Sequence, residues 1–134
     1  MAETHRQTRF LNVDLDIRAS TDLNEILAAM PSVFVLHSDA TNASVELGHS
    51  PESVEEAVLG FAEIIQTMPR RARDAWRKCE HRVLNAGIQA GTGPYEAHFE
   101  LSNDAVAALA KTGAGLTLTI YGSALTREST TGEP

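Results

Sequence analysis

Cysteine and aromatic residues are scarce in this chain, and long apolar runs are missing. The scarcity of cysteine and the lack of apolar runs each exclude a class of protein. The 134 residues include one cysteine, Cys79, which excludes an internal disulfide framework and favours a reducing, cytoplasmic setting. No apolar run approaches the ~18 residues of a membrane span, and residues 1–9 lack the apolar stretch of a signal peptide. We therefore expect no membrane contact.

Motifs for metal binding, phosphate binding and nucleophilic catalysis are also missing. No His-Glu-x-x-His or Cys-x-x-Cys spacing occurs, and the strand pattern separates His37 from His49 by roughly 17 Å, too far for one shared zinc ion. The glycine-rich segment 91–94 lacks the lysine of a phosphate loop, and Gly-x-Ser-x-Gly is absent. We expect no metal site, no cofactor and no identifiable catalytic residue.

Positive charge is in deficit, but it is unevenly distributed. The net charge of −7 argues against a general nucleic-acid binder. Six of the eleven Lys and Arg residues nevertheless lie within residues 70–82, a predicted helix whose apolar stripe includes Trp76 and Cys79. This helix is either a site for an anion or an acidic partner, or a solvated face whose arginines pair with neighbouring carboxylates. Its candidate binding residues are Arg70, Arg73 and Arg77.

Apolar residues make up 43% of the chain, and their spacing predicts alternating strands and helices. Six strands are expected, at residues 10–18, 33–37, 43–48, 83–88, 95–101 and 116–121. Four helices are expected: one capped by Asp22 and ended by Pro31, one starting at Ser50-Pro51, one over 70–82, and one between Ser102 and Gly113. The predicted order is β-α-β-β-α-α-β-β-α-β.

One apolar face on each strand and one apolar stripe on each helix indicate an α+β two-layer sandwich. In this fold a six-stranded mixed or antiparallel sheet carries all its helices on one face. We expect one domain over residues 9–122 with flexible tails at 1–8 and 123–134. Two hairpins set the register: Phe34 opposite Leu47 and Leu36 opposite Val45 in the first, Leu84 opposite Phe99 and Ala86 opposite Ala97 in the second.

The other face of this sheet carries most of the remaining candidate binding residues. Histidine between two carboxylates holds its proton more tightly, so this face could perform acid–base chemistry or hold a cation. It could equally be an ordinary solvated face. Because Val33 and Val35 add apolar surface to it, a protein interface or a homodimer is a third interpretation, and a register error of one residue a fourth. The candidates here are Asp14, Asp16, Glu96, His98, Glu100 and Tyr121.

Residues 101–110 and 113–121 form the most suggestive stretch of the chain. With the Asp22-Leu23 helix start and the proline-broken central helices, they resemble the bacterial family of domains of unknown function numbered 4279, over about residues 9–122. The resemblance implies an α+β bacterial domain without an assigned enzyme activity. Some members look like components of toxin–immunity loci, which implies a protein-binding role. No catalytic residue carries over.

These observations favour a non-catalytic protein-binding module that uses either the outer sheet face or the basic helix. The competing hypothesis is a small acid–base enzyme built on Asp14, Asp16, His98 and Tyr121, which requires those groups to converge on a concave site. A third hypothesis is anion binding through the basic helix 70–82.

Overall fold

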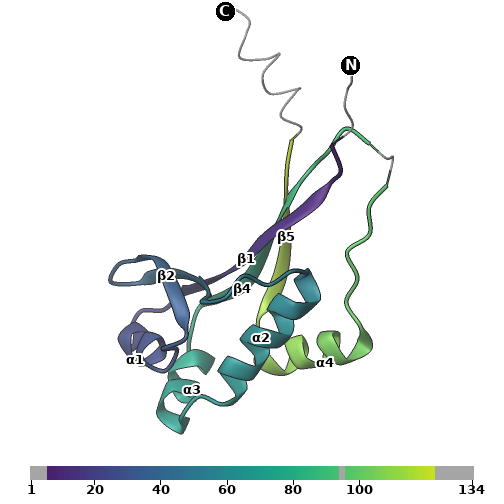
Figure 1. Ribbon diagram of the computed structural model, residues 1–134. Coiled ribbons are helices and arrows are strands. Elements are labelled where there is room, and N and C mark those ends of the chain that lie inside the picture. Colours follow the sequence, from purple (N-terminus) through teal and green to yellow (C-terminus); the bar gives the residue numbers. More distant parts are fainter. Residues whose placement is uncertain (1–5, 94–95, 123–134) are drawn as a thin grey trace, which may run out of the picture.

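A computed structural model describes residues 6–93 and 96–122 of the chain, and it confirms the mixed α+β fold. One sheet of five strands is accompanied by four helices (Figure 1). In chain order the elements are β1 (Arg9–Arg18), α1 (Leu23–Ala28), β2 (Val33–Ser38), β3 (Asn42–Leu47), α2 (Val54–Gln66), α3 (Arg70–Arg77), β4 (His81–Gln89), α4 (Asn103–Thr112) and β5 (Gly115–Tyr121).

The strands lie in the order β2-β3-β1-β4-β5. Neighbours are antiparallel except β4 and β5, which are parallel and are connected through α4. Figure 1 shows the helices gathered on one side of this sheet. The sheet therefore has one covered face and one outer face, and β2 and β5 are its edges.

The core lies between the sheet and α2. Val13 and Leu15 alternate with polar residues along β1, and both are fully buried because this face meets the helix layer. From the other side, Val58 and Phe61 on the apolar stripe of α2 are equally buried. The one-sided patterning of strands and helices thus produces the covered face directly.

The predicted fifth strand, residues 95–101, is not part of the sheet. Residues 96–101 are extended but form no ladder with any described strand, and Tyr95 lies outside the described residues. The prediction of a second hairpin is therefore wrong. Residues 95–101 were expected to pair with β4, but β1 and β5 occupy both sides of that strand. The observed order is β-α-β-β-α-α-β-α-β, with five strands rather than six.

The first hairpin forms, but its register differs by one residue from the prediction. Phe34 lies opposite Glu46, and Val35 lies opposite Val45. Phe34 is consequently 62% exposed on the outer face, whereas Val33 turns toward the core. A one-residue slip exchanges the two faces of a strand, so the apolar residues predicted outside and inside on β2 change places.

Several helix ends also differ from the prediction. Helix α2 begins after Ser53, whose hydroxyl accepts a hydrogen bond from the Glu56 N–H at 3.0 Å, rather than at Ser50-Pro51. Asp22 makes no side-chain cap and has a positive φ of 66°. Helix α3 ends at Arg77 because β4 already begins at His81, so Arg82 belongs to the sheet.

Candidate functional site

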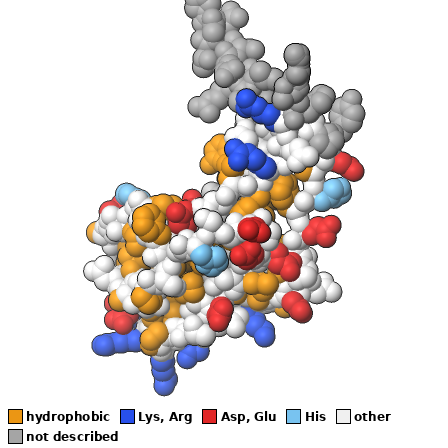
Figure 2. All heavy atoms as spheres, viewed as in Figure 1, with side chains coloured by type: hydrophobic (Ala, Val, Ile, Leu, Met, Phe, Trp, Pro, Cys, Tyr) orange, Lys and Arg blue, Asp and Glu red, His pale blue; other side chains and the backbone are white. Residues whose placement is uncertain are grey.

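Basic side chains gather at one end of the molecule. Figure 2 shows Lys and Arg projecting at the lower end of the view, where Figure 1 places α3, while Asp and Glu dominate the side beside it. The sequence cluster at 70–82 therefore remains a spatial cluster after folding. The basic residues of α3 and its C-terminal cap are Arg70, Arg71, Arg73, Arg77 and Lys78.

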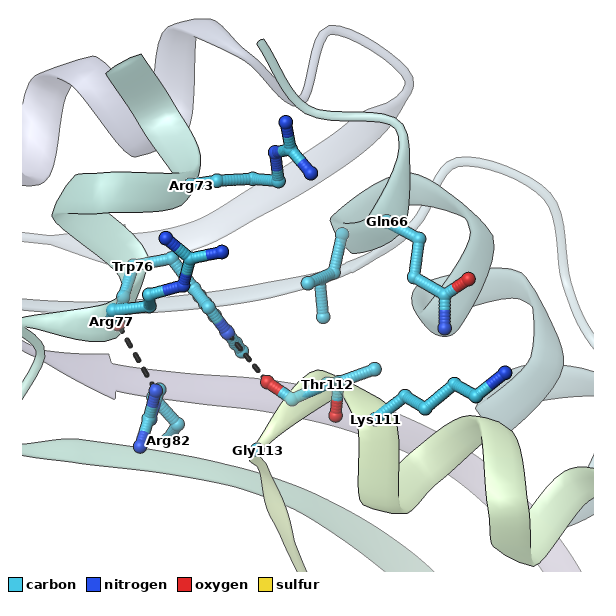
Figure 3. Close-up of a pocket in the computed structure, with 9 residues that line it drawn as sticks. Gln66, Arg73, Trp76, Arg77, Arg82, Lys111, Thr112 and Gly113 are labelled. Carbon is cyan, nitrogen blue, oxygen red and sulfur yellow. Dashed lines mark hydrogen bonds between the residues drawn. The ribbon is translucent and has the colours of Figure 1, made fainter. Parts of the chain in front are cut away.

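A pocket of about 440 Å³ opens beside this cluster, between the end of α2, α3 and the turn after α4 (Figure 3). Its volume is in the range of roughly 300–1,000 Å³ that small-ligand sites occupy. Four cationic side chains line it, and no carboxylate does. The lining residues are Ile65, Gln66, Arg73, Trp76, Arg77, Arg82, Lys111, Thr112 and Gly113.

The helical repeat of α3 places two of the arginines at the pocket. Arg73, Trp76 and Arg77 are spaced i, i+3 and i+4 and therefore share one face of the helix. Trp76 is buried against the core, whereas Arg77 is exposed. Burial of the tryptophan fixes the rotation of α3, and this rotation brings both arginines to the pocket mouth.

Trp76 joins α3 to two other elements that line the pocket, α4 and β4. Its indole Nε1–H donates a buried hydrogen bond of 2.7 Å to the carbonyl oxygen of Thr112, at the end of α4 (Figure 3). Arg82 Nη1 donates to the Trp76 carbonyl oxygen at 3.3 Å, and its Cζ lies 5.7 Å from the centre of the indole ring. Arg82 is thereby held over an aromatic face, an arrangement that favours the cation.

Gly113 lets Arg82 approach the end of α4. It is the C-terminal cap of the helix and has a φ of +79°, a conformation that glycine adopts without a steric penalty. A Cβ at this position would meet the Arg82 Nη1 at 3.3 Å. Glycine therefore satisfies two requirements here: the left-handed turn and the close approach of the guanidinium group.

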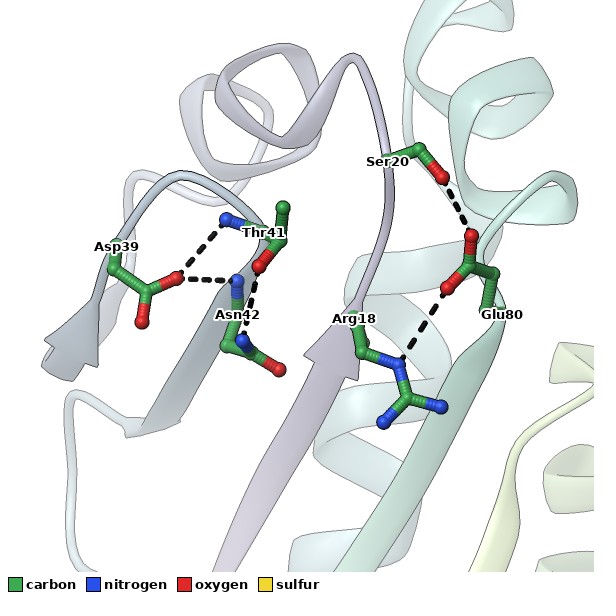
Figure 4. A network of polar contacts seen from close by, with 6 residues as sticks. All are labelled: Arg18, Ser20, Asp39, Thr41, Asn42 and Glu80. Carbon is green, nitrogen blue, oxygen red and sulfur yellow. Dashed lines mark hydrogen bonds and ion pairs between the residues drawn. The ribbon is translucent and has the colours of Figure 1, made fainter.

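Carboxylates near the basic cluster are already paired, mostly away from the pocket. Glu80 lies 3.5 Å from the Arg18 Nε and accepts a hydrogen bond from the Ser20 hydroxyl, so it is tied to the end of β1 (Figure 4). Asp74 forms an exposed pair with Arg77 at 3.2 Å. Within residues 6–93 and 96–122, Arg73, Arg82 and Lys111 form no ion pair, so the lining keeps an excess of positive charge.

The outer face of the sheet has the opposite charge. Burial, together with the nearby carboxylates of Asp16 and Glu46, raises the pKa of Asp14. Asp14 lines a shallow hollow of about 260 Å³ with Tyr121, while Asp16 accepts a 2.6 Å hydrogen bond from the Ser44 hydroxyl. This face is therefore acidic, with exposed apolar side chains around it: Leu11, Phe34, Leu36 and Tyr121.

The structure divides the predicted site residues into three groups. Asp14, Asp16 and Tyr121 share the outer face, and Arg73 and Arg77 line the basic pocket. Arg70 lies on α3 but outside the pocket lining. The remaining three, Glu96, His98 and Glu100, lie on the extended segment outside the sheet.

This division removes the proposed acid–base centre. Among the described residues, the Nε2 atom of His98 lies 3.5 Å from the carboxylate of Glu96 on the same exposed segment. The expected convergence with Asp14 and Asp16 depended on a fifth strand in the sheet. Because that strand is not part of the described sheet, His98 is not placed on the sheet face that carries Asp14 and Asp16, and the acid–base hypothesis loses the arrangement on which it was based.

Sequence reasoning missed the half of the pocket contributed by later segments. Arg82 was counted in the basic cluster but assigned to the helix, whereas Lys111, Thr112 and Gly113 were interpreted only as a helix end. A lysine in the last helical turn followed by a glycine is an ordinary helix stop. Its place beside Trp76 is a tertiary contact between residues 36 positions apart, which local patterns do not encode.

Other site classes find no support among the residues that the structure describes. Those residues contain no group of three His, Cys, Asp or Glu positioned for a metal ion. None of their helices combines the length and the apolar character of a membrane span. Cys79 is buried, as predicted, and burial raises the pKa of its thiol, which favours the unreactive protonated form.

Comparisons with family models, curated proteins and solved structures find no match to this chain. The resemblance to family 4279 therefore stays a prediction.

Proposed function

We propose that this protein is a non-catalytic binding module that holds an acidic protein partner and seats a carboxylate of that partner in the basic pocket. The observation that carries the proposal is the composition of the lining: Arg73, Arg77, Arg82 and Lys111 face one concavity without a carboxylate among the lining residues.

The chemistry of the lining favours an oxyanion. Arginine presents a planar fork of N–H donors that matches a carboxylate in two-point contact. Arg82 is held in place by its bond to the Trp76 carbonyl oxygen, so less side-chain freedom is lost when it binds a ligand. Charges of one sign in a concave site also concentrate the field that attracts the opposite charge.

The distribution of charge favours a protein partner over a nucleic acid. A nucleic-acid surface needs a basic stripe that follows many phosphates, and binding strength scales with the number of phosphates contacted. Here six of the eleven Lys and Arg residues lie within residues 70–82, most of them at one end of the molecule, in a chain whose net charge is −7, and they form no continuous basic stripe. The proposal includes a cytoplasmic setting, which the single cysteine favours, and the bacterial, immunity-like role that the resemblance to family 4279 implies.

Calorimetric titration with a glutamate-rich peptide tests the proposal. In Arg73→Gln/Lys111→Gln we expect the dissociation constant to rise by about tenfold or more, since two unpaired lining charges are lost. The matched control, Arg70→Gln/Arg71→Gln, removes the same charge from α3 outside the lining and should change affinity by less than about twofold. Added salt should weaken the binding of the unaltered protein.

Two results would overturn the proposal. One is equal weakening in the two double variants, which would mean that charge at this end of the molecule acts without a defined pocket. The other is the absence of peptide binding at low salt under conditions where inorganic phosphate or a single-stranded oligonucleotide binds.

A further inference from the structure

Residues 96–101, hereafter the arm, run as a drawn-out segment that pairs with no described strand (Figure 1). They are extended and exposed up to Glu100, and no backbone hydrogen bond connects them to another described residue. The sequence of the arm nevertheless alternates as a strand does. Ala97, Phe99 and Leu101 lie on one side, and Glu96, His98 and Glu100 lie on the other.

The edge strand β5 has a free side that pairs with no other described strand. Its sequence contains no charged residue and no proline, the two commonest devices by which edge strands prevent pairing. Leu118 and Ile120 pair with the buried residues Ala86 and Ile88 of β4, yet they are 54% and 63% exposed. The helix layer therefore leaves this part of the covered face open.

The arm of the same chain does not pair with this edge, and α4 prevents it from doing so in an antiparallel register. The ten residues of α4 lie between the arm and β5 in the chain. At a rise of 1.5 Å per residue, this helix keeps the last residue of the arm about 15 Å from the first residue of β5. A paired strand must lie about 4.8 Å from its neighbour. The start of α4 is fixed in turn, because Glu55 of α2 accepts a 2.6 Å hydrogen bond from the Ser102 N–H.

We propose that the occupant of the β5 edge is the arm of a second copy of this chain, exchanged reciprocally in a twofold dimer. Each copy in the dimer has one arm and one free β5 edge. When both arms are exchanged, every arm and every β5 edge has a partner. Strand addition of this kind satisfies the backbone groups of both segments at once.

One antiparallel register matches the two segments throughout. With Phe99 opposite Leu118 and Ala97 opposite Ile120, the exposed apolar residues of the arm and of β5 face one another, while Leu101 and Leu116 keep their contacts with the core of their own chain. On the outer side the acidic residues then oppose uncharged ones, so no like charges meet across the pair. These outer pairs are Glu96 with Tyr121, His98 with Thr119, and Glu100 with Thr117.

Engineered disulfides test the register. Oxidised His98→Cys/Thr119→Cys is expected to form a covalent dimer, because these positions are directly opposed in the proposed pair. Each single variant should give far less dimer under the same oxidation. A disulfide that closes within one chain, seen as an oxidised monomer by intact mass, would overturn the proposal.

Sedimentation equilibrium of the unmodified chain tests the dimer without cross-linking. We expect a dimer whose dissociation constant rises by about tenfold or more in Ile120→Lys. Val106→Lys is the matched control, since Val106 is 50% exposed on α4 and belongs to neither strand of the proposed pair, and it should leave the dimer intact. An unmodified chain that is monomeric at the highest accessible concentration would contradict the proposal.

Discussion

Trp76 shows how much of the pocket depends on single residues. Its indole is buried, its Nε1–H is bonded to the Thr112 carbonyl oxygen, and its own carbonyl oxygen holds Arg82. The sequence predicted that Trp76 is a core residue, because it lies on the apolar stripe of α3, and this is confirmed. The hydrogen-bond partners could not be predicted, because they come from α4 and β4.

Asp14 is a carboxylate whose ionisation the fold disfavours. Burial and the neighbouring carboxylates raise its pKa above 3.8, so the folded state binds this proton more tightly than the unfolded state. The cost of ionising Asp14 is therefore absent well below pH 3.8 and fully present once the pH exceeds the raised pKa.

Replacing Asp14 by asparagine should therefore stabilise the protein at neutral pH. We expect a gain of about 0.5 kcal/mol in the free energy of unfolding at pH 7, a modest value because solvent screens the site. The gain should disappear below pH 3.8, where the wild-type carboxyl is also neutral. Urea unfolding at both pH values measures it. Glu63→Gln, on the exposed side of α2, is the control. A gain that is the same at both pH values would refute the electrostatic cause.

At the scale of elements, the structure is most predictable where the signals are local. Helix α4 begins and ends as expected, because the Ser102 hydroxyl accepts a hydrogen bond from the Ala105 N–H and Gly113 has a positive φ. The predicted start of α2 was wrong, because Ser50-Pro51 and Ser53 are both good signals for a helix start and the sequence does not distinguish them. Alternation predicted a strand at 95–101, but alternation does not specify whether a partner strand is available.

The end of α4 provides a test at this scale. Gly113→Ala should cost about 1–2 kcal/mol of stability, the penalty for a left-handed non-glycine residue. It should also weaken glutamate-peptide binding, because the added methyl displaces the Arg82 guanidinium group. Chemical denaturation and calorimetry measure the two effects. Gly122→Ala is the control, since no residue that the structure describes lies within 4 Å of its added methyl. Unchanged affinity in a destabilised Gly113→Ala would show that Arg82 does not contact the ligand.

At the scale of the whole molecule, the fold class was predictable and the strand order was not. One-sided patterning on every element implies a sheet with one helix layer. The order β2-β3-β1-β4-β5 depends on which pairs of strands form the most stable ladders. That choice involves contacts between residues far apart in the sequence. The same reason explains why the basic helix was anticipated as a surface, but its pocket with Lys111 and Gly113 was not.

The fluorescence of Trp76 tests the central claim, that the basic pocket is the binding site, most directly. Trp76 is the only tryptophan of the chain and it lines the pocket, so its emission reports on that place alone. When a glutamate-rich peptide free of aromatic residues is added, the intensity or wavelength of the Trp76 emission should change and reach a plateau as the pocket fills. The change should be lost in Arg73→Gln/Lys111→Gln and retained in Arg70→Gln/Arg71→Gln. Unaltered emission while calorimetry registers peptide binding would contradict the account, because the ligand would then be bound elsewhere.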